Sequence, residues 1–342
     1  MRAAVYYNNH DVRLQEMPRP EIGPGEMLVR IEASGICGSD VLEWYRLSRA
    51  PLVLGHEIAG QVAAVGEGVS AWQPGDRVAV AHHVPCNTCR FCLSGRHTMC
   101  PTLWQTNFDP GGFAEYVRLP AINVDRGVFR LPDSLSYEEA TFIEPLACVL
   151  RGQRRAGVAA GNSVLVIGCG IAGLLHVKLA RAMGAARIMA TDIVEFRRQA
   201  ALFMGADAVI EPGEDMAAAV RRLNGDCLAD TVILSTGAMP AMVQGLAAVE
   251  RGGTVLVFAP AAPEATLPVA INDILWRRDV TLTTSYAGSP ADYAAALTLI
   301  ASGRVAVADL ITHRLPLSET GRGFQLVAEA KDSLKVIIEP QK

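Results

Sequence analysis

The sequence predicts an α/β protein of two domains, a small β-barrel-like domain followed by a doubly wound parallel sheet. Residues 1–149 contain short runs of alternating apolar and polar residues punctuated by Gly and Pro, which is typical of small barrels. We expect strands at the runs 3–6, 27–33, 58–65, 77–80 and 114–117. From Gly161 onward, short apolar runs alternate with helical stretches, which is typical of strand–helix units in a parallel sheet. A chain of 342 residues is long enough for two such domains.

Composition excludes several classes of function. The chain has 31 Lys and Arg against 35 Asp and Glu, and its net charge of −4 offers no positive field for nucleic acid or an anionic membrane surface. No apolar stretch approaches the ~20 residues that span a bilayer. The N-terminal residues carry no signal-peptide pattern. We therefore expect a cytoplasmic protein with a small-molecule substrate and neither a nucleic-acid nor a membrane partner.

A glycine-rich turn in the second half indicates a nucleotide site. The apolar run 164–167 leads directly into a G-x-G-x-x-G motif at 168–173, which opens a helix that we expect to end at Gly184. The next apolar run, 187–191, ends in Asp192, 19 residues after the last glycine of the motif. Strand, glycine turn, helix and acid in this order are the fingerprint of dinucleotide binding. The remaining strands of the sheet are expected at 208–210, 230–234, 254–258 and 280–284.

The fingerprint predicts NAD as the cofactor. The glycines let the backbone approach a pyrophosphate, and Asp192 can accept hydrogen bonds from the adenosine ribose. A 2′-phosphate would bring a like charge to Asp192, so NAD is preferred over NADP. Arg197 and Arg198 argue against this preference, because a nearby arginine can bind a 2′-phosphate. Arg197 could instead stack on the adenine or pair with Asp192. The expected cofactor-binding residues are Gly168, Gly170, Ala172, Gly173, Asp192 and Arg197.

Four of the eight cysteines follow a metal-binding pattern, C-x2-C-x2-C-x7-C. Four soft ligands with no open position are typical of a structural zinc site. Two disulfides or four reduced thiols are the alternatives, and His97 lies close enough in sequence to replace one sulfur. The expected ligands are Cys86, Cys89, Cys92 and Cys100.

Three further strings in the first half indicate a second metal site. They are Cys37-Gly38-Ser39-Asp40, Gly55-His56-Glu57 and Glu144-Pro145. We expect Glu144 to lie just before a helix opened by Pro145. One thiolate, one imidazole and one or two carboxylates form an incomplete zinc shell, which leaves room for water or substrate.

Together these motifs resemble the zinc-dependent medium-chain alcohol dehydrogenase/reductase family over essentially the whole chain. Glu144 stands where simple alcohol dehydrogenases carry a second cysteine, and in this the sequence resembles the sorbitol/L-iditol (polyol) dehydrogenase branch. The resemblance implies a GroES-like catalytic domain at 1–149 with the structural zinc lobe at 86–100. The expected order continues with a Rossmann domain at 150–287 and ends with 288–342, the C-terminal part of the discontinuous catalytic domain.

The resemblance also implies roles for single residues. Cys37, His56 and Glu57 would bind the catalytic zinc, and Glu144 would ligate it or hold its water. We further expect Ser39 to be the first proton acceptor, with Cys148 as an alternative ligand. Two positions depart from the polyol branch. Leu42 replaces a proton-relaying histidine, and Ser285-Tyr286, our candidate substrate residues, replace an Arg-Tyr pair.

The expected reaction is the reversible oxidation of a secondary alcohol of a polyol or cyclitol to the ketone with NAD⁺. An L-threonine, vicinal-diol or aminocyclitol dehydrogenase is the alternative within the family. A catalytically inactive NAD- and zinc-binding sensor is the alternative outside it, and its signature would be missing ligands. The expected strand 280–284, which is rich in β-branched residues, lies at a predicted sheet edge, so we expect a homodimer or homotetramer that covers this edge.

Overall fold

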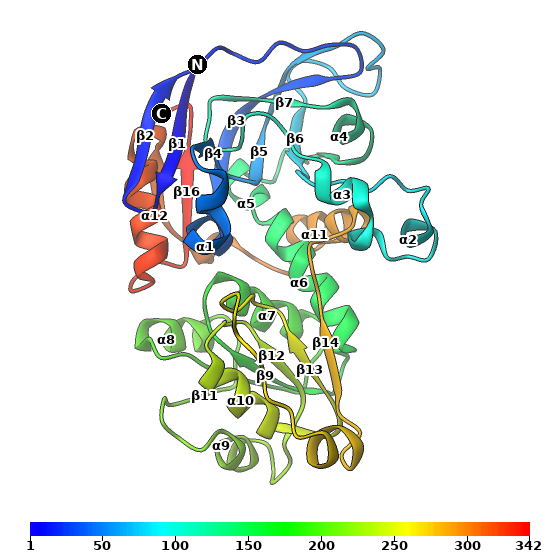
Figure 1. Ribbon diagram of the computed structural model, residues 1–342, viewed down its shortest axis with the longest axis vertical. Helices are drawn as coiled ribbons and strands as arrows, with labels where there is room; N and C mark the ends of the chain where they lie inside the picture. Colours follow the sequence, from blue (N-terminus) through cyan, green and yellow to red (C-terminus); the bar gives the residue numbers. More distant parts are fainter. The chain divides into compact units, whose positions relative to one another are not determined.

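The computed structural model describes all residues, 1–342, as two compact units (Figure 1). The first unit combines residues 1–147 with 288–342, and the second comprises residues 148–287. The C-terminal stretch therefore joins the N-terminal one across the intervening unit. None of the helices combines the length and the apolarity that a bilayer span requires.

The first unit is built on two β-sheets. The larger has the strand order β15-β16-β3-β5-β6-β8, with β7 paired to β3, and the smaller has the order β2-β1-β4. Its strands are β1 (Arg2–Asn8), β2 (Asp11–Glu16), β3 (Met27–Gly35), β4 (Leu52–Val53), β5 (Glu57–Val65), β6 (Arg77–Val80), β7 (Tyr116–Leu119), β8 (Val128–Arg130), β15 (Ile311–Pro316) and β16 (Lys335–Glu339). Its helices are α1 (Glu43–Arg46), α2 (Arg90–Leu93), α3 (Pro101–Gln105), α4 (Ala121–Arg126), α5 (Tyr137–Ala140), α11 (Pro290–Ala301) and α12 (Thr320–Glu329).

Apolar side chains from distant segments form the core of this unit. Tyr6 of β1 and Phe113 both pack against Phe324 of α12, with ring centroids 5.3 and 5.6 Å from that ring. A second cluster includes Met27, Ile31, Val62, Val78 and Val117 of the large sheet, all of them buried. The C-terminal segment thus contributes to the same core as β1.

The second unit is a six-stranded parallel sheet with the order β11-β10-β9-β12-β13-β14. In sequence terms this is 3-2-1-4-5-6, the order of a dinucleotide-binding sheet, and the prediction of a doubly wound sheet is confirmed. Its elements are β9 (Ser163–Ile167), α7 (Ile171–Ala182), β10 (Arg187–Thr191), α8 (Glu195–Phe203), β11 (Ala208–Ile210), α9 (Met216–Leu223), β12 (Ala229–Leu234), α10 (Met239–Ala247), β13 (Val249–Val257), a π-helical turn (Ile271–Trp276) and β14 (Thr281–Thr284). Helix α6 (Ile143–Ala156) begins in the first unit and ends in the second.

The structure corrects two local predictions. Helix α6 begins at Ile143, so Glu144 lies in its first turn and Pro145 is not the first helical residue. The first turn tolerates Pro145 because its amides have no acceptors within the helix. The strand that we expected at 114–117 lies at Tyr116–Leu119, because Ala114 forms an isolated bridge with Ala3 instead.

Candidate metal centres and nucleotide site

Strand pairing in the large sheet brings three metal-ligand candidates together. Cys37 lies just after β3, and His56 immediately precedes Glu57, the first residue of β5. These two strands are antiparallel, and Gly35 pairs directly with Glu57. The ligand atoms of Cys37, His56 and Glu57 all lie within 4.8 Å of one another. Residues 19 and 20 positions apart in sequence thus form one potential coordination site.

A buried carboxylate orients the imidazole. Asp40, which has no solvent exposure, lies with Oδ1 3.4 Å from Nδ1 of His56 and 3.2 Å from the Arg46 guanidinium. Its other oxygen accepts a hydrogen bond from the Cys37 amide at 3.1 Å. Because Nδ1 of His56 faces Asp40, Nε2 is left for a metal. Burial acts to raise the pKa of Asp40, but His56 and Arg46 outweigh it and lower the pKa below its ordinary value.

Glu57 forms a fully buried ion pair that the sequence did not reveal. One carboxylate oxygen, Oε2, accepts a hydrogen bond from Nζ of Lys335 on β16, and neither side chain has any exposed surface. Lys335 also donates to the Ile36 carbonyl at 3.3 Å. A side chain at Gly35 would collide with both partners, so the glycine leaves the space that this ion pair occupies. A single lysine in an apolar strand gives no sign of its partner 278 residues away.

These surroundings fit a zinc ion. Oε1 of Glu57 is buried and has no hydrogen-bond partner, so one carboxylate oxygen remains free to coordinate. Burial opposes the charged form of His56, yet Asp40 and the Cys37 thiol raise its pKa well above the ordinary value, which shows that the surroundings favour a cation. Sulfur, nitrogen and oxygen donors with an incomplete shell are the set found in catalytic zinc sites.

Other predicted residues lie around this group. Ser39 Oγ donates a hydrogen bond to Cys37 Sγ at 3.4 Å and accepts one from Arg46 at 3.1 Å. Glu144 is 9% exposed and is not one of the three clustered donors. Cys148, one turn further along α6, is partly buried. The roles of Ser39, Glu144 and Cys148 stay predictions.

Two adjacent histidines, which our sequence analysis did not select, extend the site. The His82 ring lies 4.9 Å from the His56 ring and 3.9 Å from the His83 ring, measured between centroids. Burial, and then His83 and His56, hold the pKa of His82 well below its ordinary value, because the surroundings disfavour the charged form of the ring. The only signal in the sequence was a His-His pair shortly before the first lobe cysteine, without a metal-ligand spacing.

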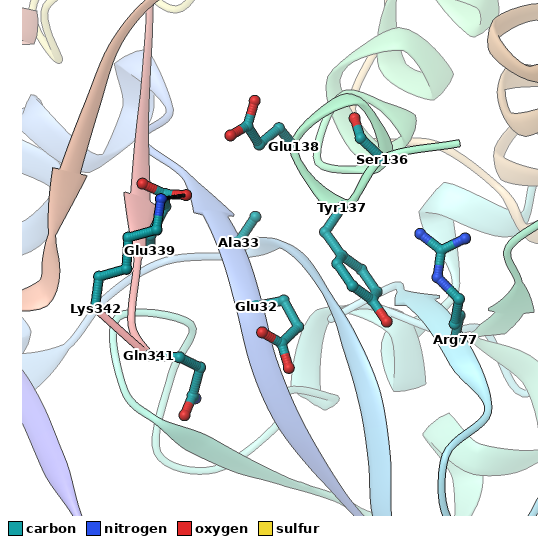
Figure 2. Close-up of a pocket in the computed structure, with 9 residues that line it drawn as sticks. All are labelled: Glu32, Ala33, Arg77, Ser136, Tyr137, Glu138, Glu339, Gln341 and Lys342. Atoms are coloured by element: carbon teal, nitrogen blue, oxygen red, sulfur yellow. Dashed lines mark ion pairs between the residues drawn. The ribbon is translucent and has the colours of Figure 1, made fainter. Parts of the chain in front are cut away.

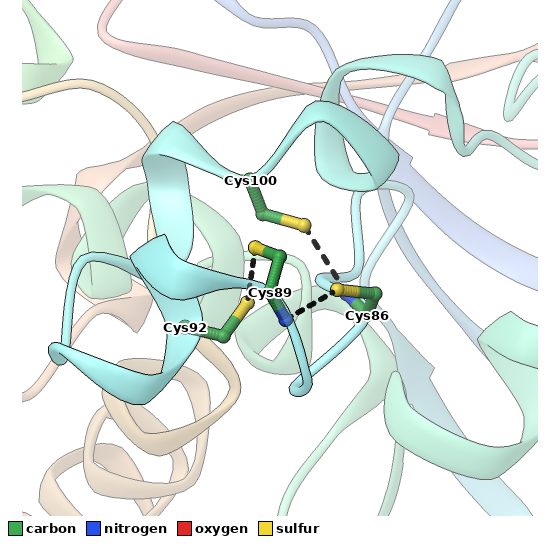
Figure 3. A group of neighbouring side chains, drawn as sticks. All are labelled: Cys86, Cys89, Cys92 and Cys100. Atoms are coloured by element: carbon green, nitrogen blue, oxygen red, sulfur yellow. Dashed lines mark hydrogen bonds between the residues drawn. The ribbon is translucent and has the colours of Figure 1, made fainter.

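The four lobe cysteines converge on one point (Figure 3). All four are free thiols, which excludes the predicted alternative of two disulfides, and Sγ of Cys89 and Cys92 are 3.6 Å apart. Hydrogen bonds from Thr88, with one from the Cys89 amide, lower the pKa of Cys86 to about 5, whereas burial raises the pKa of Cys92 to about 12. A cation would stabilise all four as thiolates, so the donor set fits zinc. His97 is not one of the clustered donors.

The glycine motif forms a tight turn at the end of β9. Gly168 has φ +94°, and a Cβ atom there would lie 2.9 Å from the Ser235 carbonyl oxygen after β12. A side chain on Gly173 would meet the Gly168 carbonyl, so this glycine permits close packing of helix on strand. Gly170 is the N-cap of α7, and Ala172 lies in its first turn. The free amides of this turn fit a pyrophosphate.

Asp192 occupies the expected place at the end of β10. Its Oδ2 accepts a hydrogen bond from the Cys169 amide at 2.7 Å, and its Oδ1 accepts one from the Val194 amide at 2.9 Å. Arg198 is occupied elsewhere, because it donates to the Asp192 carbonyl at 2.9 Å and pairs with Glu211 at 2.8 Å.

Arg197 and the candidate substrate residues also belong to the second unit. Arg197 reaches toward the glycine turn, with one guanidinium nitrogen 3.9 Å from the Cβ position of Gly170, and its Nε is buried without a partner. It forms no ion pair with Asp192. Ser285 and Tyr286 follow β14. The Ser285 hydroxyl is buried without a partner, and Tyr286 is 44% exposed.

A separate cavity of about 290 Å³ in the first unit contains none of the predicted site residues (Figure 2). Two of its acidic side chains are already paired, Glu138 with Arg314 at 2.8 Å and Glu339 with Lys342 at 2.7 Å. The cavity is lined by Glu32, Ala33, Arg77, Ser136, Tyr137, Glu138, Glu339, Gln341 and Lys342.

Comparison with known proteins gives the same family for both units. Residues 23–133 match the family described as "Alcohol dehydrogenase GroES-like domain", and residues 172–302 match "Zinc-binding dehydrogenase". Sorbitol dehydrogenase of Gallus gallus is 34% identical over 98% of this chain and 96% of its own length.

Two solved structures extend the comparison. A zinc-binding dehydrogenase of Sinorhizobium meliloti bound to NADP superposes with a TM-score of 0.88 at 29% identity, covering 99% of both chains. The 2R,3R-butanediol dehydrogenase of Bacillus subtilis superposes with a TM-score of 0.86 at 27% identity, again over 99% of both chains.

The two donor groups predict two zinc ions per chain, measurable by elemental analysis of freshly purified protein. Cys89→Ser should remove about one zinc and lower the thermal unfolding temperature, because the lobe loses its cross-link. Cys37→Ser should abolish alcohol oxidation while the protein stays folded. The matched control is Cys227→Ser at an exposed free thiol, which should change neither property. One zinc or none in fully folded wild-type protein would contradict the assignment.

Proposed function

This chain belongs to the zinc-dependent medium-chain alcohol dehydrogenases, and from that premise we propose that its substrate is a neutral polyol or cyclitol. The enzyme is an oxidoreductase with zinc and a nicotinamide cofactor. In the proposed reaction a secondary hydroxyl is oxidised reversibly to the ketone, as in an L-iditol/sorbitol 2-dehydrogenase. The alternatives that we carry forward are L-threonine, a simple vicinal diol and an aminocyclitol.

The observation that carries the proposal is charge compensation around the three donors. Glu57 is paired with Lys335, and Asp40 is paired with Arg46. The Cys37 thiolate would offset part of the charge of a divalent cation. The two buried carboxylates beside the donors are thus already matched by cations of the protein, so they leave no unpaired negative charge for the ammonium group of an amino acid, and burying an unpaired charge there would be costly. This balance supports an uncharged polyhydroxy substrate over L-threonine.

In the proposed mechanism, Cys37, His56 and Glu57 hold the zinc. When bound, zinc supplies a Lewis acid that makes a substrate hydroxyl easier to deprotonate. Asp40 fixes the His56 ring through Nδ1, as described above. Ser39 Oγ would take up the substrate proton while it passes its own hydroxyl proton to a further acceptor, so that the serine stays neutral. The Arg46 guanidinium, which donates to Oγ at 3.1 Å, holds the hydroxyl in place for this transfer. Leu42 cannot relay a proton, so the route onward does not pass through that position.

The relatives support the same substrate class. The Gallus gallus relative is named for sorbitol, and the Bacillus subtilis structure is named for a vicinal diol. Both substrates carry a hydroxyl next to the one that is oxidised. Ser285 in place of an arginine argues for a polyhydroxy substrate held differently from sorbitol.

A substrate panel tests the proposal. We expect NADH formation to be more efficient, in kcat/KM, with sorbitol, L-iditol, myo-inositol or 2R,3R-butanediol than with ethanol. L-threonine, which carries an ammonium and a carboxylate group, is included to test the alternative that the substrate is an amino acid. The proposal is wrong if ethanol or L-threonine exceeds every polyol, diol and cyclitol in the panel.

We also propose that the coenzyme is NAD rather than NADP. The carboxylate of Asp192 is fixed by two backbone amides, and its remaining lone pairs can accept from the ribose. Two unit charges ~4 Å apart at an effective dielectric of ~20 repel by about 4 kcal/mol. Screening at a partly exposed site reduces this to about 1–3 kcal/mol, or about ten- to a hundredfold in affinity. Arg198, the second candidate for a 2′-phosphate, is already engaged with Glu211.

The ratio of kcat/KM for NAD⁺ and NADP⁺, at one pH and one salt concentration, measures this preference. Asp192→Ser should lower the ratio of the NAD⁺ value to the NADP⁺ value by about tenfold or more, because it removes the repulsion between the carboxylate and a 2′-phosphate. Asp226→Ser, at an acid after α9 that has no role in the proposal, is the control. Equal efficiencies in the wild type, or an NADP⁺ preference, would overturn the assignment.

Finally, we propose that the chain forms a homo-oligomer through β14. This strand ends the sheet order of the second unit, and its outer edge has no partner strand. Leu282 on the strand and Trp276 just before it are 37% and 74% exposed. Pairing with a second copy about a two-fold axis would cover the edge. Light scattering at micromolar concentration should give at least the mass of a dimer, and a monomeric mass contradicts the proposal.

A further inference from the structure

The imidazole of His82 is a polar group beside the metal-ligand candidates that has no polar partner. Its ring lies near three other rings, those of His56 at 4.9 Å, His83 at 3.9 Å and Phe108 at 6.3 Å between centroids. Nδ1 is buried without a hydrogen-bond partner. The residue is nevertheless partly exposed, so the ring is not sealed in the core.

The backbone around His82 is held firmly in place. The buried side chain of Asn123 donates hydrogen bonds to the carbonyl oxygens of Ala81 and His82 at 3.1 and 2.9 Å. His83 Nδ1 lies 2.6 Å from the Thr106 carbonyl oxygen, so that nitrogen of His83 carries the proton and donates. Nδ1 of His83 therefore has a hydrogen-bond partner within the protein, whereas Nδ1 of His82 has none although its backbone is held in place.

Such an arrangement is costly unless a ligand completes it. A buried donor or acceptor without a partner costs about 1–3 kcal/mol, and native structures satisfy nearly all such groups. A neutral imidazole offers one N–H donor and one lone pair. A hydroxyl group also donates and accepts, so it complements a neutral imidazole in either tautomer.

We propose that His82 is a specificity-determining residue that hydrogen-bonds the second hydroxyl of the substrate, on the carbon next to the one oxidised. The ring lies 4.9 Å from that of His56, one of the three metal-ligand candidates, at an interplanar angle of 49°, so it is next to the group at which the reacting hydroxyl would bind. A substrate that lacks the neighbouring hydroxyl leaves the imidazole unpaired and is disfavoured. This inference rests on the proposed function. It adds the feature of the substrate that the enzyme recognises, a hydroxyl on the carbon next to the one that is oxidised.

The test compares two alcohols that differ in that hydroxyl alone, 2R,3R-butanediol and 2-butanol. His82→Phe keeps an aromatic ring against His56 but removes both nitrogens. We expect kcat/KM for the diol to fall about tenfold while that for 2-butanol changes by less than about twofold. His82→Gln, whose amide again donates and accepts, should restore part of the diol preference. His313→Phe, at a half-buried histidine on β15, is the matched control and should leave both values unchanged.

Two further measurements separate recognition from damage to the fold. Zinc content should stay at two per chain in His82→Phe, and calorimetric binding of the diol to the enzyme–NADH complex should weaken by about tenfold. An equal loss for both alcohols, or an unchanged diol preference, in His82→Phe overturns the inference. So does a diol preference that His82→Gln fails to restore when zinc is retained.

The outcome for the proposed function is read from the wild type alone. A wild-type enzyme for which ethanol or L-threonine exceeds every polyol, diol and cyclitol contradicts the polyol proposal and, with it, the role of His82. A wild-type enzyme that prefers the diol, together with a His82→Phe variant that keeps the preference, leaves the polyol proposal intact and refutes only the role of His82.

Discussion

The first unit depends on neutralising the carboxylates that its fold buries. Glu57 and Asp40 have no exposed surface, and an uncompensated charge in such a place costs several kcal/mol. Lys335, 278 residues along the chain from Glu57, supplies one of the opposite charges. Strand β16 lies beside β3, and the register that pairs Ile337 with Gly35, and Gly35 with Glu57, brings the lysine to its partner. The need for this pair is a physical reason for a discontinuous unit.

The two metal-ligand groups differ in how their charge is balanced. In the lobe, four sulfurs form the whole donor set, and amide and hydroxyl groups such as those of Thr88 stabilise the negative charge on sulfur. At the other group, Cys37 contributes the one sulfur, and the charge of Glu57 is already offset by Lys335. A divalent ion there keeps more of its positive charge than an ion in the lobe does. The first arrangement suits a structural ion, and the second suits a Lewis acid.

Sequence reasoning succeeded where the chemistry constrains residue type at short spacing. The glycine turn at 168–173, the acid at Asp192 and the C-x2-C pairs are local patterns, and the structure places each in the expected context. The six-stranded sheet followed from buried apolar runs, which are continuous in parallel sheets. The start of α6 was misjudged, because Pro145 is equally compatible with several positions in a first turn.

The cations that pair with the buried carboxylates could not be found in this way. Charge balance requires a cation close in space, but it does not determine how far away in the sequence that cation lies. Lys335 reaches its carboxylate from a distant strand and Arg46 from the end of the short helix α1, and neither belongs to a motif. Replacing either would leave a buried charge unpaired, so these positions have little freedom to change. His82 lies in the same surroundings, where its Nδ1 has no partner and Asn123 holds its backbone. Under the role that we propose for it, substrate preference can change at position 82 without disturbing the ion pairs that hold the site together.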